Sequence, residues 1–361
     1  MSAPNARSAR PAPPPLDPEQ VAAATLACLP GITAARLRDL IAASGGPVGA
    51  LAAVLRGARG KEWRRAAASP RVAELVAARH PQVYVRGRPG YPVVDELPGM
   101  PEVLLAEGAA DDAFDRPRVA VVGTRAATPH GLADAREIGA VLGAAGITVV
   151  SGLAIGIDAA AHDGTIDAGG VAVGVLGTGL DVVYPRRHTR LFERVRAHGL
   201  LVSELGYGVQ PRRESFPIRN RVIAALADVV VVVEATARGG ARITAERAVE
   251  FGRPVLAMPG SRRNPAAEGT NALIADGAEP LLEPRDVLLA LGLTPGARGH
   301  DARPRPEGDA AEVLRACGGE PATVDQLASR TGLPVDRVAV AVRALERGNW
   351  LERASGLCWP R

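Results

Sequence analysis

The sequence contains little cysteine, few aromatic residues and a single lysine, and these shortages exclude several classes of protein. Its three cysteines, Cys28, Cys317 and Cys358, lie far apart and form no CxxC pair, which argues against a disulfide framework and a zinc site. Apolar runs such as residues 229–233 are far shorter than the ~18–20 residues that span a bilayer. The basic start, MSAPNARSAR, is followed by no apolar stretch of the kind that a secretory signal needs. We therefore expect a soluble, cytoplasmic protein that binds neither metal nor membrane.

The composition is otherwise that of a globular protein with a mild basic excess. The 361 residues are 47% hydrophobic and 23% charged, so a sizeable core can form, and the length predicts two or three domains. Because aromatics make up only 3%, that core has to be built mainly from Ala, Val and Leu. The net charge is +4, and Lys61 is the only lysine, so nearly every cation is an arginine, which suits phosphates and base faces. The charge favours a polyanionic partner, although a general replacement of lysine by arginine also explains the count.

Changes in composition divide the chain into five segments. Residues 1–18 are rich in proline and predict a disordered tail, and residues 19–80 have the apolar spacing of a small helical domain. Within that domain, LACLPGITAARLRDLI resembles a helix-hairpin-helix element, and an ordinary helical corner fits it as well. We expect residues 81–292 to form an α/β domain, residues 293–308 a Pro/Gly/Arg linker, and residues 309–361 a winged-helix domain.

The α/β segment is predicted to form a Rossmann-like, doubly wound and mostly parallel sheet. Its strands are short runs of Val, Ile, Leu and Ala, which indicate burial on both faces, and helix-length segments separate them. The expected strands are Val119–Val122, Thr148–Val150, Ala172–Leu176, Leu200–Val202, Asp228–Val233 and Pro254–Met258. In such sheets ligands bind beyond the carboxyl ends of the strands, so we expect the functional site at that edge.

Glycine-containing turns follow the first two expected strands and can cradle a phosphate with backbone N–H groups. They are Gly123-Thr124-Arg125 and Ser151-Gly152. Neither turn matches the GxGxxG pattern, so a dinucleotide is not expected, and we predict no cofactor. Arg125 can reach over the edge of the sheet toward a phosphate, or it can pair with a surface carboxylate, and the sequence leaves both interpretations open.

The segment SFPIRNR places an aromatic ring beside several hydrogen-bonding groups. Phe216 can stack on a base while Arg219, Asn220 and Arg221 bind phosphate, and Arg213 adds charge upstream. The alternative is that Phe216 fills the core at the start of a helix. We favour stacking because phenylalanine is rare in this chain, with only four residues.

Two further patterns indicate chemistry only weakly. Asp158 and His162 are four residues apart and share a helix face, but no third ligand accompanies them, so we interpret both as structural. The stretch ARGGARITAE resembles in part the P-G-G-x-G-T-x-x-E loop of lysine-decarboxylase-like phosphoribohydrolases, with Gly239 and Gly240 before Glu246. It lacks the Pro, the second Gly and the Thr of that loop, which weakens an N-glycosidase interpretation.

Taken in order, the motifs of residues 91–292 are similar to those of the DprA/Smf family of DNA-processing proteins. They are VAVVGTRAATPHG, VVSGLAIGIDAAAHDG, GVLGTGLDVVYP, SELGYG, FPIRNRVIAALADVVVVVEA, GGARITAERAVEFGRPVLAMPG and EGTNALIADGA. A helix-hairpin-helix or sterile-alpha-motif-like domain in front and a winged helix behind also fit this family. Two departures are that Gly239-Gly240-Ala241 replaces the family's Ser-Gly-Ser/Thr, and that arginines must stand in for its DNA-binding lysines.

The resemblance implies a protein without enzymatic activity, cofactor or metal that binds single-stranded DNA along the sheet edge. Such proteins protect the strand, help to load the RecA recombinase during natural transformation, and usually act as dimers, with single-strand-binding protein as a further partner. The resemblance assigns a phosphate contact to Arg125, base stacking to Phe216, and a place in the same pocket to Asn220 and Arg221. The DNA-binding residues that we predict are Gly123, Thr124, Arg125, Ser151, Gly152, Arg213, Phe216, Arg219, Asn220, Arg221 and Gly240.

Two other functions stay open at this point. The Gly239-Gly240 loop allows a nucleotide-processing enzyme of the phosphoribohydrolase type, which would release free base from nucleoside monophosphates. The winged helix allows a protein that binds duplex DNA, although its expected recognition helix, residues 335–347, mixes arginines with acidic residues.

Overall fold

The computed structural model divides the chain into two compact units, residues 1–297 and residues 298–361. The described residues are 16–79, 81–93, 97–293, 306–317, 322–348, 350–354 and 357–360. Most of the tail predicted for residues 1–18 and most of the linker predicted for residues 293–308 lie outside the described residues. Each unit is described here by itself.

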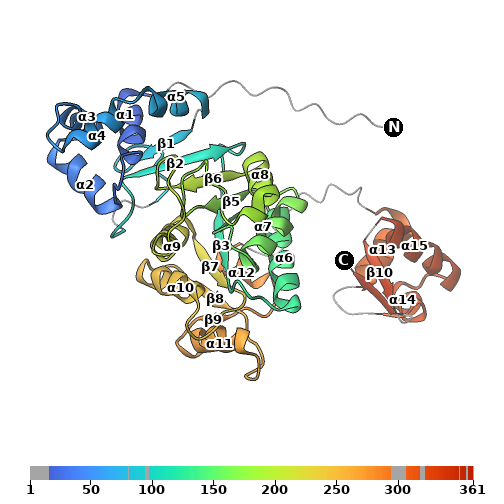
Figure 1. Ribbon diagram of the computed structural model, residues 1–361. Coiled ribbons are helices and arrows are strands. Elements are labelled where there is room, and N and C mark those ends of the chain that lie inside the picture. The colour runs from blue at the N-terminus through green and yellow to red at the C-terminus, as the bar shows by residue number, and fades with distance from the viewer. Residues whose placement is uncertain are drawn as a thin grey trace. The chain divides into compact units, whose positions relative to one another are not determined.

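A nine-stranded sheet forms the centre of the first unit (Figure 1). Its parallel strands are β3 (Arg118–Val122), β4 (Thr148–Ser151), β5 (Ala172–Val175), β6 (Leu200–Ser203), β7 (Val229–Val232), β8 (Val255–Ala257) and β9 (Glu279–Pro280). Two antiparallel strands, β1 (Gln82–Val85) and β2 (Val103–Gly108), extend the sheet beyond β6. This is the predicted α/β, mostly parallel, doubly wound fold, and all six expected strands are present. The sequence pattern does not predict β1, β2 or β9.

Helices cover both faces of the sheet. They are α6 (Pro129–Ala144), α7 (Ile157–Asp167), η1 (Arg186–His188), α8 (Thr189–His198), α9 (Ser215–Leu226), α10 (Gly240–Glu250), η2 (Pro265–Ala267), α11 (Glu268–Ala275) and α12 (Asp286–Ala290). The side chains of successive strand residues pack into the hydrophobic clusters on opposite faces of the sheet, because side chains alternate across a strand. Val121 packs in a cluster with residues of α6 and α7, whereas Val122 packs in one with residues of α9 and α10.

The order of the strands places a crevice between β3 and β7. Across the sheet the order is β1-β2-β6-β5-β4-β3-β7-β8-β9, so β4, β5 and β6 build outward on one side of β3, and β7, β8 and β9 on the other. The loops that follow β3 and β7 therefore leave the sheet in different directions. Open α/β sheets bind their ligands at this kind of switch point, beyond the carboxyl ends of the strands.

Both edges of the sheet are short or covered. At one edge, β9 has only two residues, Glu279 and Pro280, and both are exposed. At the other edge, the side chain of Gln20 donates a hydrogen bond of 3.0 Å to the Val83 carbonyl oxygen of β1. Gln20 belongs to the helix α1 (Pro18–Ala27), which begins with a capping box formed by Asp17 and Gln20.

The N-terminal helices share a hydrophobic core with the sheet. They are α1, α2 (Ala34–Ala43), α3 (Pro47–Leu55), α4 (Lys61–Ala67) and α5 (Pro70–Arg79). Leu26 of α1 lies in one buried cluster with Leu105 of β2 and Leu201 of β6. Gly206 follows β6, and a Cβ there would lie 2.5 Å from the Cα of Cys28, so the backbones are in close contact. The domain boundary that we predicted at residue 80 stays a prediction. The hydrophobic cluster of the N-terminal helices continues across it into the sheet.

None of the helices in the described ranges is by itself long and apolar enough to cross a membrane. The pair α2 and α3, which is bent by 94° at its break, reaches that length and apolarity only when the two are joined.

The second unit has the predicted winged-helix arrangement. Its elements are α13 (Gly308–Cys317), α14 (Val324–Thr331), α15 (Val335–Arg347) and an antiparallel hairpin of β10 (Leu351–Ala354) and β11 (Leu357–Pro360). Thr323 caps the start of α14: its hydroxyl accepts a hydrogen bond from the Gln326 N–H, and the Gln326 side-chain oxygen accepts one from the Thr323 N–H. Gly332 ends α14 in the left-handed conformation with φ of 70°, which favours glycine.

The shared core generates a stability prediction. Leu26 is 0% exposed, so Leu26→Ala should lower the free energy of unfolding by roughly 2–5 kcal/mol through lost burial and a cavity. Val21 lies on the same helix and is 41% exposed, so Val21→Ala should change it by less than about 0.5 kcal/mol. Urea denaturation followed by circular dichroism measures both. Equal effects of the two substitutions would show that α1 is not anchored to the sheet.

Candidate nucleic-acid interface

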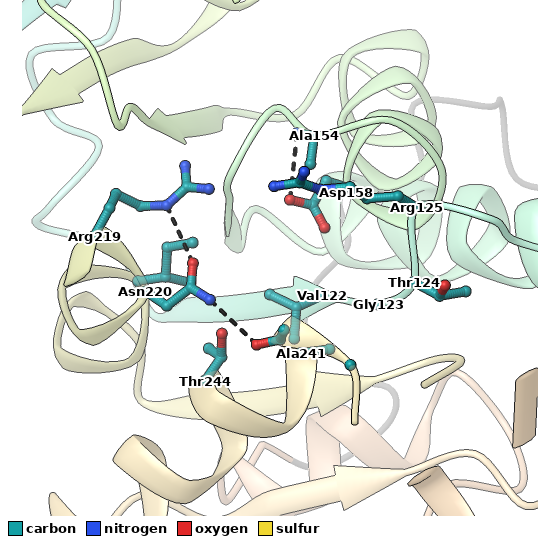
Figure 2. Close-up of a pocket in the computed structure, with 13 residues that line it drawn as sticks. Val122, Gly123, Thr124, Arg125, Ala154, Asp158, Arg219, Asn220, Ala241 and Thr244 are labelled. Atoms are coloured by element: carbon teal, nitrogen blue, oxygen red, sulfur yellow. Dashed lines mark hydrogen bonds between the residues drawn. The ribbon is translucent and has the colours of Figure 1, made fainter. Parts of the chain in front are cut away.

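A pocket of about 320 Å³ opens at the carboxyl ends of β3 and β7, at the switch point of the sheet (Figure 2). Residues from the end of β3, the loop after β4, α9 and the start of α10 line it. They are Val122, Gly123, Thr124, Arg125, Ala154, Asp158, Arg219, Asn220, Ile223, Gly239, Gly240, Ala241 and Thr244. The edge at which the sequence places the site is therefore hollowed, and six predicted residues line this pocket.

The turn after β3 is held against β7 by backbone hydrogen bonding. The Thr124 N–H donates to the Glu234 carbonyl oxygen at 2.7 Å. The Glu234 carboxylate accepts hydrogen bonds from the Thr128 hydroxyl at 2.6 Å and the Thr128 N–H at 2.9 Å, at the start of α6. A Cβ on Gly123 would lie 2.4 Å from the Ile157 side chain, so close packing against α7 requires glycine there. The turn thus has a fixed shape before any ligand binds.

The loop after β4 is organised by the carboxylate of Asp158. This carboxylate accepts hydrogen bonds from the N–H groups of Gly152 at 3.0 Å and Ala154 at 3.4 Å. Between them, Leu153 adopts a φ of 54°, which is uncommon for a residue with a side chain. Burial raises the pKa of Asp158, while the nearby Arg219 and the loop N–H groups oppose that rise. The structural interpretation of Asp158 is consistent with these contacts, and its carboxylate also forms part of the pocket wall.

Arg219 is a buried cation that joins the ends of two strands to α9. The residue is 4% exposed, and its guanidinium donates to the carbonyl oxygens of Gly152, at 2.9 Å, and Val175. Its Nε donates to the Asn220 side-chain oxygen at 3.2 Å, and the Asn220 amide donates to the Gly240 carbonyl oxygen at 3.2 Å. Burial lowers the pKa of Arg219 to about 10, so the group stays charged at neutral pH.

Arg125 is the exposed cation of the pocket. It enters from the side opposite Arg219 in Figure 2, and no carboxylate of the described residues lies within ion-pair distance of its guanidinium. The surface ion pair that the sequence left open is therefore not formed within the described part of the chain. With two guanidinium groups and the single carboxylate of Asp158, the pocket wall has a net positive charge that suits an anion.

A second, smaller pocket of about 40 Å³ adjoins the first. Arg125, Ala154 and Arg219 line both, and Gly152, Ile155, Tyr184, Pro185 and Phe216 complete the second. Phe216 is half-buried and belongs to none of the buried apolar clusters of the described residues. Its ring stacks on Tyr184 with centroids 5.2 Å apart, and the Arg125 guanidinium lies 5.4 Å from its centroid.

The remaining predicted residues lie outside these two pockets. Ser151 is fully buried, and its hydroxyl donates to the Val121 carbonyl oxygen at 2.6 Å. Arg221 forms a two-pronged ion pair with Glu204, with N–O distances of 2.8 and 2.7 Å. Arg213 is exposed in the loop before α9 and lines neither pocket. Their assignment to DNA binding stays a prediction.

Among the lining residues that were not predicted for the site, three have polar side chains: Asp158, Tyr184 and Thr244. Asp158 sits in the first turn of α7, as expected, but the sequence gives no sign that its carboxylate turns back to the β4 loop. Tyr184 is the next-to-last residue of the motif GVLGTGLDVVYP, and an aromatic residue after a strand-end glycine turn is the signal that could have identified it.

Comparisons with known proteins cover both units. A family model described as DNA recombination-mediator protein A matches residues 82–292, and one described as DprA winged helix domain matches residues 299–356. The chain is 36% identical to Protein Smf of Synechocystis over 321 residues, which is 78% of this chain and 81% of the relative. It is 39% identical to Protein Smf of Escherichia coli over 265 residues, 71% of each chain.

Two solved structures are also similar. The X-ray structure of DNA processing protein A from Streptococcus pneumoniae matches with a TM-score of 0.55 and 30% identity, over 72% of this chain and 98% of that one. DNA processing protein A from Helicobacter pylori matches with a TM-score of 0.52 and 26% identity, over 59% of this chain and 96% of that one. The Helicobacter structure concerns a single-stranded DNA binding mode.

The buried histidine of α7 generates a pH prediction. His162 is fully buried, and burial lowers its pKa from 6.5 to about 4. As the pH falls from about 6.5 to about 4, the unfolded chain takes up this proton before the folded protein does, so stability is lost. The titration of His162 should account for roughly 3 kcal/mol of this loss in the free energy of unfolding.

His162→Leu removes this titration. The difference in unfolding free energy between the native chain and the variant, measured by urea denaturation at several pH values, should shift toward the variant as the pH falls. Two pH profiles that stay parallel through this window would contradict the assignment.

Proposed function

The chain belongs to the DprA/Smf family of DNA-processing proteins, and from this premise we propose that it binds single-stranded DNA at the pocket between β3 and β7. It then acts as a recombination mediator that holds the strand for RecA. The observation that supports this most directly is the exposed Arg125 guanidinium, which has no ion-pair partner among the described residues and faces a pocket of net positive charge. Membership in a recombination-mediator family supports the second step, and the Helicobacter relative binds single-stranded DNA.

The pocket offers a strand the two contacts on which sequence-independent binding depends. Arg125 provides a charge for a phosphate, and Gly123 and Thr124 line the pocket beside it. In the adjoining pocket Phe216 and Tyr184 form a stacked aromatic pair, which provides an apolar surface for a base. Gly240 has no atom within 4 Å of where a Cβ would be, so the start of α10 leaves room for the sugar–phosphate chain.

A nucleotide-processing enzyme is less well supported. Glu246, the acidic residue of the partial phosphoribohydrolase loop, is exposed in α10 and does not line the pocket. The carboxylate that does line it, Asp158, is held by two backbone N–H groups and faces Arg219. A single tethered carboxylate does not provide the separate acid and base that glycosidic bond cleavage generally uses.

We expect Arg125→Ala to weaken binding of single-stranded oligothymidylate without lowering the melting temperature. If Arg125 contacts one phosphate, the slope of log affinity against log salt should shrink by about 0.7. Fluorescence anisotropy across a salt series measures both quantities. Arg285→Ala removes the same charge from an exposed position just before α12 and should leave affinity and slope unchanged. An Arg125 variant with the native slope would remove Arg125 from the interface.

The mediator role has its own experiment. Adding the protein to single strands coated with single-strand-binding protein should speed their uptake by RecA, and Arg125→Ala should abolish that effect. The protein should neither shorten the DNA nor release base from nucleoside monophosphates. Base release that disappears in an Asp158→Asn variant would favour the enzyme instead. Tighter binding of duplex than of single strand would favour a duplex-binding protein.

A further inference from the structure

Tyr184 is an exposed aromatic residue beside the Phe216 pocket. Its side chain is 41% exposed, whereas every other aromatic side chain that the structure describes is half-buried or buried. Its ring stacks on that of Phe216 at an interplanar angle of 29°. Its hydroxyl forms no hydrogen bond with any described residue. A large apolar ring held in the open by a second ring is a surface on which a planar ligand can stack.

Phe216 has less free surface to offer. Tyr184 stacks on it, the Arg125 guanidinium lies 5.4 Å from its centroid, and a Cβ on Gly177 would lie 2.9 Å from its Cδ1. The ring is therefore packed against three neighbours and is only half-buried at the pocket. A base that enters here meets the outward face of Tyr184 as the most accessible aromatic surface.

A basic segment follows Tyr184 directly. Arg186 and Arg187 form η1 with His188, and Arg190 lies in the first turn of α8. All three arginines are exposed, and no described carboxylate lies within ion-pair distance of them. A carboxylate does lie nearby in the sequence, that of Asp181, before Tyr184. It accepts a hydrogen bond of 2.7 Å from the Gly208 N–H and does not pair with these arginines.

His188 fixes this basic segment to the pocket. Its Nδ1 is 3.1 Å from the carbonyl oxygen of Leu153, in the loop after β4 that Asp158 organises. Pro185, between Tyr184 and Arg186, lines the smaller pocket itself. The arginines of η1 therefore begin where the pocket wall ends, and their charges continue the positive surface that starts at Arg125.

From this arrangement we propose that Tyr184 stacks on a base of the bound strand and that Arg186, Arg187 and Arg190 bind the phosphates that follow. The strand thus leaves the pocket along the start of α8. This inference rests on the proposed single-strand binding. It adds a residue that stacks on a base and a path along which the strand leaves the pocket. Phe216 acts here as a positioning residue, because it holds the Tyr184 ring.

The ring is tested with three substitutions at one position. Tyr184→Ala should weaken binding of oligothymidylate roughly 5- to 150-fold, the range that loss of one stacked base produces. Tyr184→Phe keeps the ring and should restore the lost affinity. Tyr184→Trp should show tryptophan fluorescence that is quenched when the strand binds. Melting temperatures of all three verify that the fold is intact.

The basic segment is tested with a matched pair of double variants in the full chain. Arg186→Gln/Arg187→Gln should reduce the log–log salt slope by about 1.4, because two phosphate contacts are lost. Arg247→Gln/Arg285→Gln makes the same change of charge on the far end of α10 and before α12, and should leave the slope as it is. The reduced salt slope of Arg186→Gln/Arg187→Gln should appear with an oligothymidylate of about 16 nucleotides. It should vanish with one of about 4, since the short strand fills only the pocket.

The outcomes separate this inference from the function on which it rests. If the native chain binds no single-stranded DNA, the proposed function fails and the inference fails with it. If the native chain binds and Arg125→Ala weakens binding, while Tyr184→Ala and the η1 double variant bind as the native chain does, only the inference is overturned. An unquenched Tyr184→Trp signal at saturating strand would likewise overturn the stacking.

Discussion

One buried guanidinium holds the functional edge of the sheet together. Arg219 of α9 donates to the backbone at the ends of β4 and β5, and through Asn220 it reaches the first residue of α10. A charge removed from water is costly unless it is paired, and here the carbonyl oxygens and the nearby Asp158 provide compensation. Gly152 must lack a side chain for this arrangement, since a Cβ would lie 2.5 Å from the guanidinium. The shape of the pocket is therefore fixed by the fold before a ligand arrives.

Burial and pairing decide what each arginine of this edge can do. Arg219, Arg221 and Arg125 have the same functional group, yet the first supports backbone and the second is tied to Glu204. Only Arg125 is exposed with no ion pair among the described residues. Inside the pocket a bound polyanion therefore meets the free guanidinium of Arg125 beside an arginine that the backbone already satisfies, and binding breaks no internal ion pair. This fits a surface that holds and releases a strand.

The sequence predicted the sheet better than it predicted the roles of individual side chains. Strands β3 to β8 were evident because strands buried on both faces are runs of apolar residues. By contrast, β9 has only two residues, and β1, with the sequence QVYV, alternates half-buried and buried residues, so neither strand is a fully buried apolar run. The rule for open α/β sheets also predicted the edge at which the pocket lies. Contacts between distant segments bury Ser151, pair Arg221 with Glu204 and place Tyr184 on Phe216. One sequence does not reveal such contacts.

The way in which the sheet ends has a consequence for assembly. An open strand edge offers a row of unpaired N–H and C=O groups on which another chain can add a strand. Here β9 is two residues long and one of them is Pro280, which has no N–H to donate, while the Val83 carbonyl oxygen of β1 is already occupied by Gln20. Growth of the hydrogen-bonded ladder from one molecule into the next is therefore blocked at β9 and hindered at β1. These sheet edges therefore favour association of copies through side-chain surfaces, which can be separated again without unravelling a strand.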